Sequence, residues 1–222
     1  MNIKRLFDKY VLEISTVCAH AWLIDPVSPA RYGTNEIMKA VQLAKLLDVD
    51  YVVTTENEPT TPFAEKLTYE QQILVVAEKL YEPVQMASDL GVTILLEPHG
   101  PLTDSVQGLK DILSALDNSP GIGINLDTGN SWLGGADPVE IAREFKDQIK
   151  HVHWKDLPAE FEEQRGTKFG MGYGPIPLGA GVIDLEGVFN ELKDCDIPHC
   201  TLEMIAEHML ESYEYLKGLG SE

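Results

Sequence analysis

The chain has 222 residues, of which 44% are hydrophobic and 24% charged, a composition typical of a globular protein rather than a disordered one. Asp and Glu outnumber Lys and Arg by 36 to 17, and the formal net charge of −19 opposes binding to nucleic acid or to an anionic membrane. Apolar runs are too short for a membrane span, and three scattered cysteines do not form a secreted disulfide pattern. We therefore expect one cytoplasmic domain over residues 1–222, whose charge suits either a small neutral substrate or a bound divalent cation.

Short apolar runs alternate along the chain with stretches of helical periodicity. The runs predict strands, and the amphipathic stretches between them predict helices. This alternation is typical of a parallel sheet covered by helices. The predicted strands are Tyr10–Thr16, Tyr51–Thr55, Val92–Pro98, Ile122–Asp127, Ile149–Trp154 and Cys200–Met204, and the predicted helices are Thr34–Leu47, Thr68–Asp89, Ser105–Leu116, Asp137–Lys146, Asp184–Lys193 and Ala206–Leu216, the last ended by Gly218.

The spacing of the strand ends indicates the architecture. Glu97 and Asp127 are 30 residues apart, Asp127 and His153 are 26 apart, and the 50 residues from His153 to Glu203 correspond to two units of about 25. Seven βα units result, which favours an α/β fold of the (β/α)₈ TIM barrel type. An open doubly wound sheet is less well supported, because the first strand–helix turns carry no glycine fingerprint. The stretch 158–182, with its glycines, predicts a long functional loop.

The first strand of such a barrel is missing from this pattern. Ile3, Leu6, Phe7 and Tyr10 recur at helical spacing and lead directly into the strand that would be numbered second. Unpaired edge strands expose backbone donors and acceptors and favour association. We therefore expect either an upstream βα unit of about 25–30 residues, or a gap covered by a loop or by a neighbouring subunit of a homo-oligomer.

Polar side chains stand at the carboxyl ends of four predicted strands. Because side chains alternate across a strand, Glu97, Asp127, His153 and Glu203 all face the same interior. Any one of them alone would more often be a capping or surface residue. Three buried carboxylates would repel one another and raise one another's pKa, a cost that a divalent cation removes. Three carboxylates and one imidazole favour Mn²⁺, with Mg²⁺, Co²⁺ or Zn²⁺ as alternatives, and leave positions open for substrate oxygens.

Three further residues near these strand ends are candidates for substrate binding. His99 shares the inward side with Glu97 and could contact substrate or act as a base, or it could orient a metal ligand. Lys155 continues the row from His153 and could neutralise an enolate oxygen. Its alternative is a rim salt bridge with Asp156 or Glu203. His20 follows the first predicted strand and is expected at the mouth of the barrel.

Taken together, the chain resembles the xylose isomerase-like barrels, a family that includes sugar-phosphate isomerase/epimerases, ketose 3-epimerases and inosose dehydratases. The resemblance covers residues 10–205 and rests on five motifs, Leu96-Glu97-Pro98-His99, Leu126-Asp127-Thr128-Gly129-Asn130, His151-Val152-His153-Trp154-Lys155-Asp156, Leu178-Gly179-Ala180-Gly181-Val182-Ile183-Asp184 and Leu202-Glu203. It implies that Glu97, Asp127, His153 and Glu203 bind the metal. It also implies that the two glutamates are catalytic, one removing a proton from the reacting carbon and the other returning it.

The activity that this resemblance implies is that of a divalent-metal-dependent isomerase or epimerase for a small carbohydrate, working through an enediolate. The chain departs from many epimerases at two positions, since Asn130 stands in place of a histidine and Ala159 in place of an arginine. We expect Asn130 to bind substrate, in contacts unlike theirs. A lyase or dehydratase acting on keto-sugars, 3-keto-glycosides or inososes is the second interpretation. The net charge disfavours a DNA-repair endonuclease, and a binding protein with a structural metal would show no turnover.

Overall fold

The computed structural model describes residues 3–25 and 32–220. In this part of the chain, six parallel strands form one sheet in sequence order, so that each strand pairs with the next. The predicted strands Tyr51–Thr55, Ile122–Asp127 and Ile149–Trp154 are confirmed with their bounds. The strands are β1 Val17–Cys18, β2 Tyr51–Thr55, β3 Thr93–Glu97, β4 Ile122–Asp127, β5 Ile149–Trp154 and β6 His199–Leu202.

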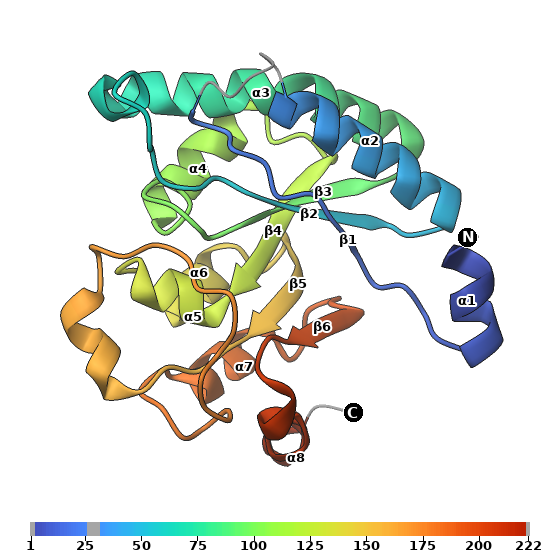
Figure 1. The fold of residues 1–222 in the computed structure, drawn as a ribbon, viewed down its shortest axis with the longest axis vertical. Helices are drawn as coiled ribbons and strands as arrows, with labels where there is room; N and C mark the ends of the chain where they lie inside the picture. The colour runs from blue at the N-terminus through green and yellow to red at the C-terminus, as the bar shows by residue number, and fades with distance from the viewer. Residues whose placement is uncertain (1–2, 26–31, 221–222) are drawn as a thin grey trace.

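Helices connect the strands and cover the outer side of the curled sheet (Figure 1). Helix α2 packs on α3, α3 on α4, and α6 on α7, so the helices form a continuous outer layer. This is the layering of a TIM barrel, present here as a partial barrel, and it confirms the predicted fold class. The helices are α1 Ile3–Tyr10, α2 Tyr32–Leu47, α3 Tyr69–Leu90, α4 Val106–Ala115, α5 Thr128–Leu133, α6 Pro138–Glu144, α7 Leu185–Leu192 and α8 Met209–Leu219, with 3₁₀ turns at Ala64–Lys66, Ala159–Gln164 and Ala206–His208.

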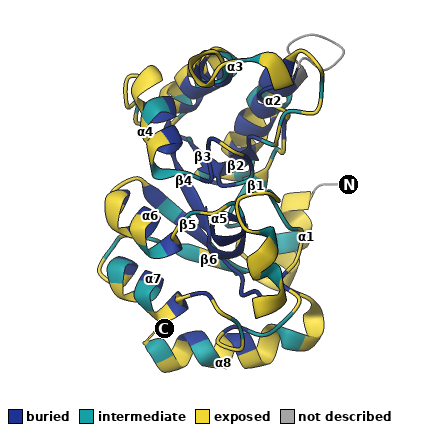
Figure 2. Ribbon diagram, turned by 90° about the vertical axis from the view of Figure 1, so that its left-hand side faces the viewer, coloured by how far each residue is buried: buried dark blue, intermediate teal, exposed yellow. Residues whose placement is uncertain are grey.

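The core lies between the sheet and these helices, as the dark blue strands and inner helix faces of Figure 2 show. Helix α3 illustrates how the sequence builds it. Thr68 and Gln71 form a capping box at its start, and Gly91 closes its end in the left-handed conformation with φ 68°. One face of α3 is buried against the sheet and the neighbouring helices, through Ile73, Val76, Ala77, Leu80, Pro83, Val84 and Ala87.

The first predicted strand, Tyr10–Thr16, is wrong. The chain leaves α1 at Val11, which has a positive φ of 54°, and stays irregular until Val17. Only Val17 and Cys18 pair with a neighbour, through Val52 and Val53 of β2. Alternating apolar residues in this segment resemble a strand locally, but a strand forms only where a partner offers its backbone groups.

The seven βα units counted from the spacing are also wrong, because the stretch between β5 and β6 contributes no strand to the described sheet. β5 pairs directly with β6. The stretch makes one isolated bridge, from Gly174 to Met204. Gly166 and Gly170 have φ of 71° and 72°, conformations that interrupt an extended chain. The expectation of a long loop over residues 158–182 is met, apart from the 3₁₀ turn within it.

Two details near helix ends differ from the predicted boundaries. Gly218 lies inside α8, and the helix ends at Gly220, whose φ of 110° closes it. Helix α5 was not predicted, because its six residues are too few to show helical periodicity. It begins directly after β4, and its N-cap is Asp127, whose Oδ1 accepts a hydrogen bond from Asn130 N at 2.7 Å.

Within residues 3–25 and 32–220, no helix combines the length and the apolar character needed to cross a lipid bilayer.

A pair of leucines in α3 tests the packing described above. Leu80 is fully buried, whereas Leu74 on the same helix is 65% exposed. Leu80→Ala is expected to lower the free energy of unfolding by about 2–5 kcal/mol, because it removes buried methyl groups and leaves a cavity. Leu74→Ala should change it by less than about 0.5 kcal/mol. Urea denaturation of both variants measures the difference, and equal losses would contradict the assigned packing.

Candidate metal centre

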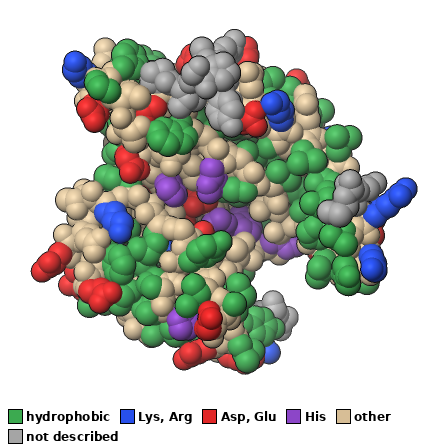
Figure 3. All heavy atoms as spheres, in the orientation of Figure 1, with side chains coloured by type: hydrophobic (Ala, Val, Ile, Leu, Met, Phe, Trp, Pro, Cys, Tyr) green, Lys and Arg blue, Asp and Glu red, His purple; other side chains and the backbone are tan. Residues whose placement is uncertain are grey.

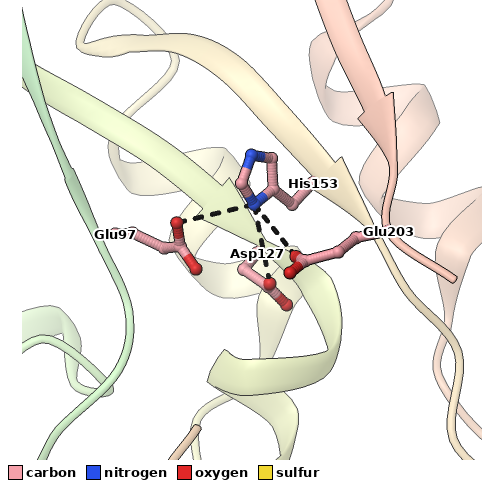
Figure 4. Close-up of side chains that lie close together, drawn as sticks. All are labelled: Glu97, Asp127, His153 and Glu203. Carbon is pink, nitrogen blue, oxygen red and sulfur yellow. Dashed lines mark ion pairs between the residues drawn. The ribbon is translucent and has the colours of Figure 1, made fainter. Parts of the chain in front are cut away.

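Four side chains converge at the carboxyl ends of the strands (Figure 4). Each of Glu97, Asp127, His153 and Glu203 offers one donor atom, and these atoms all lie within 4.8 Å of one another. His153 Nδ1 is 3.0 Å from Glu203 Oε2, 3.5 Å from Glu97 Oε2 and 3.9 Å from Asp127 Oδ2. The structure therefore brings together the four residues that strand parity placed on one side.

Neighbouring strands hold these four residues in register. Asp127 of β4 pairs with His153 of β5, so that the two side chains leave the sheet side by side. Glu97 is the last residue of β3, and Glu203 comes directly after the last residue of β6. Because the strands are parallel and adjacent, their ends meet at one rim, where a TIM barrel carries its functional groups.

The Glu97 carboxylate is fixed by two amide side chains. Asn125 Nδ2 donates to its Oε2 at 3.0 Å, and Asn130 Nδ2 donates to its Oε1 at 3.2 Å. Asn125 Oδ1 lies 2.9 Å from His151 Nδ1, which continues this buried network along β4 and β5. Asn125 and His151 were not singled out from the sequence. The signal available there was a buried polar pair inside two otherwise apolar strands, which requires partners.

The donor atoms fit a divalent cation. His153 Nδ1 and Glu203 Oε2 are both buried, and they lack hydrogen-bond geometry although they are 3.0 Å apart. Buried polar atoms normally have a hydrogen-bond partner, so atoms that converge without one fit a site for an ion. Carboxylate oxygens and an imidazole nitrogen are ligands for Mg²⁺, Mn²⁺, Co²⁺ and Zn²⁺ alike.

The electrostatics of this cluster favour positive charge. Burial raises the pKa of Asp127 to about 7, although Lys155 acts in the opposite direction. Burial by itself would lower the pKa of His153, but the carboxylates of Glu203 and Glu97 raise it to about 10. Burial would raise the pKa of Glu203, yet His153 and Lys155 lower it to about 2. The negative charge of the carboxylates thus stabilises a positively charged group placed among them.

Lys155 is not a rim residue. It is fully buried, and its Nζ donates to Asp127 Oδ2 at 2.9 Å and lies 3.2 Å from Glu203 Oε2. The expected pairing with Glu203 is present, whereas Asp156 instead accepts backbone N–H groups from Gly179, Gly181 and other residues of the following loop. A buried lysine lowers the cost of collecting three carboxylates in one place.

The remaining candidate residues surround this centre at different depths. Asn130 is buried. Its Nδ2 donates a hydrogen bond to Glu97 Oε1, and its Oδ1 accepts hydrogen bonds from Lys155 Nζ and Met171 N. The rings of His99 and His20 lie with centroids 6.2 Å apart. Figure 3 shows histidine side chains gathered in a hollow near the middle of this face of the molecule. His99 Nδ1 is buried without a hydrogen-bond partner among the described residues.

A buried glutamate supports the loop that follows Glu97. Glu56, directly after β2, accepts backbone hydrogen bonds from Thr103 N at 2.7 Å and from Leu102 N at 3.1 Å. Burial raises the pKa of Glu56 to about 7, although these hydrogen bonds act in the opposite direction. Glu56 was not singled out from the sequence, where the available signal was its position directly after a predicted strand.

Comparison with known proteins agrees with this architecture. A family profile described as xylose isomerase-like TIM barrel matches residues 1–219. The chain therefore belongs to this family, as the sequence motifs predicted. Among solved structures, a D-tagatose 3-epimerase-like protein has a TM-score of 0.77 and 23% identity, and the match covers 98% of this chain and 80% of that one. A structure of the IOLI protein with a bound zinc atom has a TM-score of 0.72 and 19% identity, covering 99% and 80%.

Curated relatives match over shorter segments. A 3-dehydroshikimate dehydratase of Bacillus anthracis is 30% identical over 114 residues, 46% of this chain and 39% of the relative. An inosose dehydratase of Clostridium beijerinckii is 28% identical over 148 residues, 63% of this chain and 49% of the relative. The matches thus span at most about half the length of these two relatives, and both relatives are named as dehydratases.

Substitution of the ligands tests the metal centre. The wild-type protein is expected to bind a single divalent cation per chain, and Asp127→Ala and His153→Ala should lose it, because each removes a converging donor atom. Metal analysis after dialysis against Mn²⁺ measures the content, with circular dichroism as the check on folding. His208→Ala, on the 3₁₀ turn before α8, is the control and should keep the wild-type content. A full metal equivalent in both ligand variants would contradict the assignment.

The buried Glu56 predicts a pH dependence of stability. Its folded pKa of about 7 lies above the ordinary value of 4.5, so the folded protein binds this proton more tightly than the unfolded chain does. The resulting stabilisation is present below about pH 4.5 and is lost as the pH rises through about 7, by up to about 3 kcal/mol.

Glu56→Gln cannot ionise, so its free energy of unfolding should fall less than that of wild type between pH 5 and about pH 8. Urea denaturation across this range measures the two slopes, and exposed Glu207→Gln serves as the control that follows wild type. Parallel curves for Glu56→Gln and wild type would show that Glu56 has the same pKa in the folded and the unfolded protein, and would contradict the prediction.

Proposed function

We propose that the chain is a divalent-metal-dependent isomerase or epimerase that moves a proton on the carbon next to the carbonyl of a small carbohydrate. The observation that carries this proposal is the placement of two carboxylates on opposite sides of the metal centre. Figure 4 shows Glu97 and Glu203 approaching the cluster from different strands, with Asp127 and His153 between them. Two proton-transfer groups facing one position can serve both faces of a reacting carbon.

The two glutamates are held differently. Glu97 is almost fully buried, and the amides of Asn125 and Asn130 fix both of its oxygens. The Glu203 side chain is 23% exposed and is balanced by Lys155. In the proposed reaction, one carboxylate accepts the proton from carbon and the other returns a proton to the opposite face. A bound cation would polarise the substrate carbonyl and stabilise the enediolate.

Mn²⁺ is the proposed cation, because three carboxylates and one histidine suit an ion that accepts mixed oxygen and nitrogen ligands with open positions. A solved structure of this fold, that of the IOLI protein, contains a bound zinc atom, which supports metal binding by this chain. The substrate class rests on the relatives, whose names include a D-tagatose 3-epimerase-like protein, a 3-dehydroshikimate dehydratase and an inosose dehydratase. Tagatose, dehydroshikimate and inososes each carry a ketone, which is the group that acidifies the neighbouring carbon-bound proton.

A metal-dependent lyase or dehydratase is the second candidate, and two observations favour it. The curated relatives reported above are dehydratases. In addition, His99 stands two residues after Glu97, and its Nδ1 has no hydrogen-bond partner within the described chain. An imidazole in this position could complete an elimination after the first proton has been removed. Both candidates share that first proton transfer and differ in the second chemical step.

Solvent exchange tests the proposed chemistry. Purified protein with Mn²⁺ is incubated in D₂O with ketoses, inososes and 3-keto-glycosides, and deuterium beside the carbonyl is measured by mass spectrometry. Glu97→Gln and Glu203→Gln should each slow turnover about a hundredfold or more, since each variant loses a proton-transfer group. Glu207→Gln, outside the centre, should match wild type.

The products separate the two candidates. Epimerisation yields an isomer of unchanged mass apart from deuterium, whereas elimination yields a product that has lost water. Near-normal turnover in either glutamate variant would contradict the two-base mechanism. Absence of exchange with every substrate, in a protein shown to bind Mn²⁺, would contradict the proposed substrate class.

A further inference from the structure

The long loop between β5 and α7 enters the metal centre through one short segment, Gly170–Gly174, which we call the strap. Met171 N donates to Asn130 Oδ1 at 2.8 Å, and Met171 O accepts from Lys155 Nζ at 2.6 Å. Gly174 N donates to the backbone oxygen of Glu203 at 2.8 Å. The strap is therefore bonded to a proposed ligand, Glu203, and to Asn130 and Lys155, two of the side chains that contact the proposed ligands.

Lys155 connects the strap to the carboxylates. Its Nζ has four oxygen atoms within 3.2 Å, from Met171, Asp127, Asn130 and Glu203. An ammonium group has only three N–H donors. Three of these oxygens, from Met171, Asp127 and Asn130, accept the three N–H groups, whereas Glu203 Oε2 is in ion-pair contact without a hydrogen bond. Asp127 and Glu203 are also the carboxylates that a cation would attract.

Gly170 allows the strap to lie against His99. Its φ is 72°, in the left-handed region that favours glycine, and a Cβ added there would overlap the His99 ring. Gly172, two residues further along the strap, differs on both counts. It has no positive φ, and a Cβ added to it would meet no atom within 4 Å. The two glycines therefore provide a matched pair of positions for testing the contact between the strap and His99.

We propose that Lys155 is a positioning residue that couples the strap to the metal centre, so that cation binding orders the strap over the substrate site. A cation that neutralises Asp127 and Glu203 leaves the N–H groups of Lys155 to Met171 O and Asn130 Oδ1, which tightens the strap. A bound cation would then stabilise the wall of the substrate site beside His99. This inference rests on the proposed metal centre, but not on which reaction the centre catalyses.

Hydrogen exchange of the strap amides tests the coupling. Peptides that contain Met171 and Gly174 are followed by mass spectrometry with and without Mn²⁺, and Mn²⁺ binding is measured separately by calorimetry. In wild type, Mn²⁺ should slow exchange of these amides about tenfold, the factor that one charge-assisted hydrogen bond supplies. In Lys155→Met, any Mn²⁺ that binds should leave the exchange rate unchanged.

Gly170→Ala keeps Lys155 and all four proposed ligands. It therefore tests the coupling even if the Lys155→Met variant does not fold. Gly170→Ala should bind Mn²⁺ and yet show fast exchange at Met171 in both conditions, because the strap cannot seat against His99. Gly172→Ala should retain the wild-type protection. On a substrate found by the exchange assay, Gly170→Ala should raise KM more than it lowers kcat, the pattern of an impaired substrate wall.

The outcomes separate this inference from the proposed function. Failure of wild type to bind Mn²⁺ would overturn both. Binding of Mn²⁺ with unchanged exchange in the strap would overturn the coupling and leave the metal centre intact. Equal protection by Mn²⁺ in wild type and in a folded Lys155→Met variant would show that the strap is ordered without Lys155.

Discussion

Like charges buried at the end of an apolar sheet are the constraint on which the rest of this site depends. Glu97 and Asp127 leave strands whose other side chains are largely buried, and Glu203 joins them within 4.8 Å. Carboxylates at this depth lose their hydration and repel one another, so a fold that collects them must supply compensating charge or hydrogen bonds. The side chains around these carboxylates supply such charge and hydrogen bonds.

The compensation comes from distinct sources. Lys155 supplies a full positive charge to Asp127 and Glu203, and amide groups of Asn125 and Asn130 hold Glu97. Asp127 also caps helix α5, so one of its oxygens is engaged by backbone while the other faces Lys155. Because hydrogen bonds fix the orientation of the Glu97 and Asp127 carboxylates, these two groups would bind a cation with little rearrangement.

The family relationship fits this division of labour. A D-tagatose 3-epimerase-like structure shares the fold of this chain, and the curated relatives are named as dehydratases, so the barrel by itself does not select a reaction. The ends of the strands hold the four residues of the proposed metal centre, and loops at the carboxyl ends of TIM barrel strands generally carry the groups that meet substrate. In this chain, those loops bring His99 and the strap to the centre, so these are the positions where its own chemistry would be decided.

The sequence by itself determined most of the elements and the side of the sheet that the four clustered residues share. Strands β2, β4 and β5 follow from local apolar runs, and the inward side of Glu97, Asp127, His153 and Glu203 follows from alternation along each strand. Both are properties of residues close together in the chain. The tertiary structure alone decided that Lys155 is buried between carboxylates and that Asn130 holds Glu97. It also decided that β1 is only two residues long and that Gly170 reaches His99. These contacts join segments up to 71 residues apart, the separation between His99 and Gly170. Whether a charged side chain or a glycine is buried depends on which distant segments of the chain pack around it.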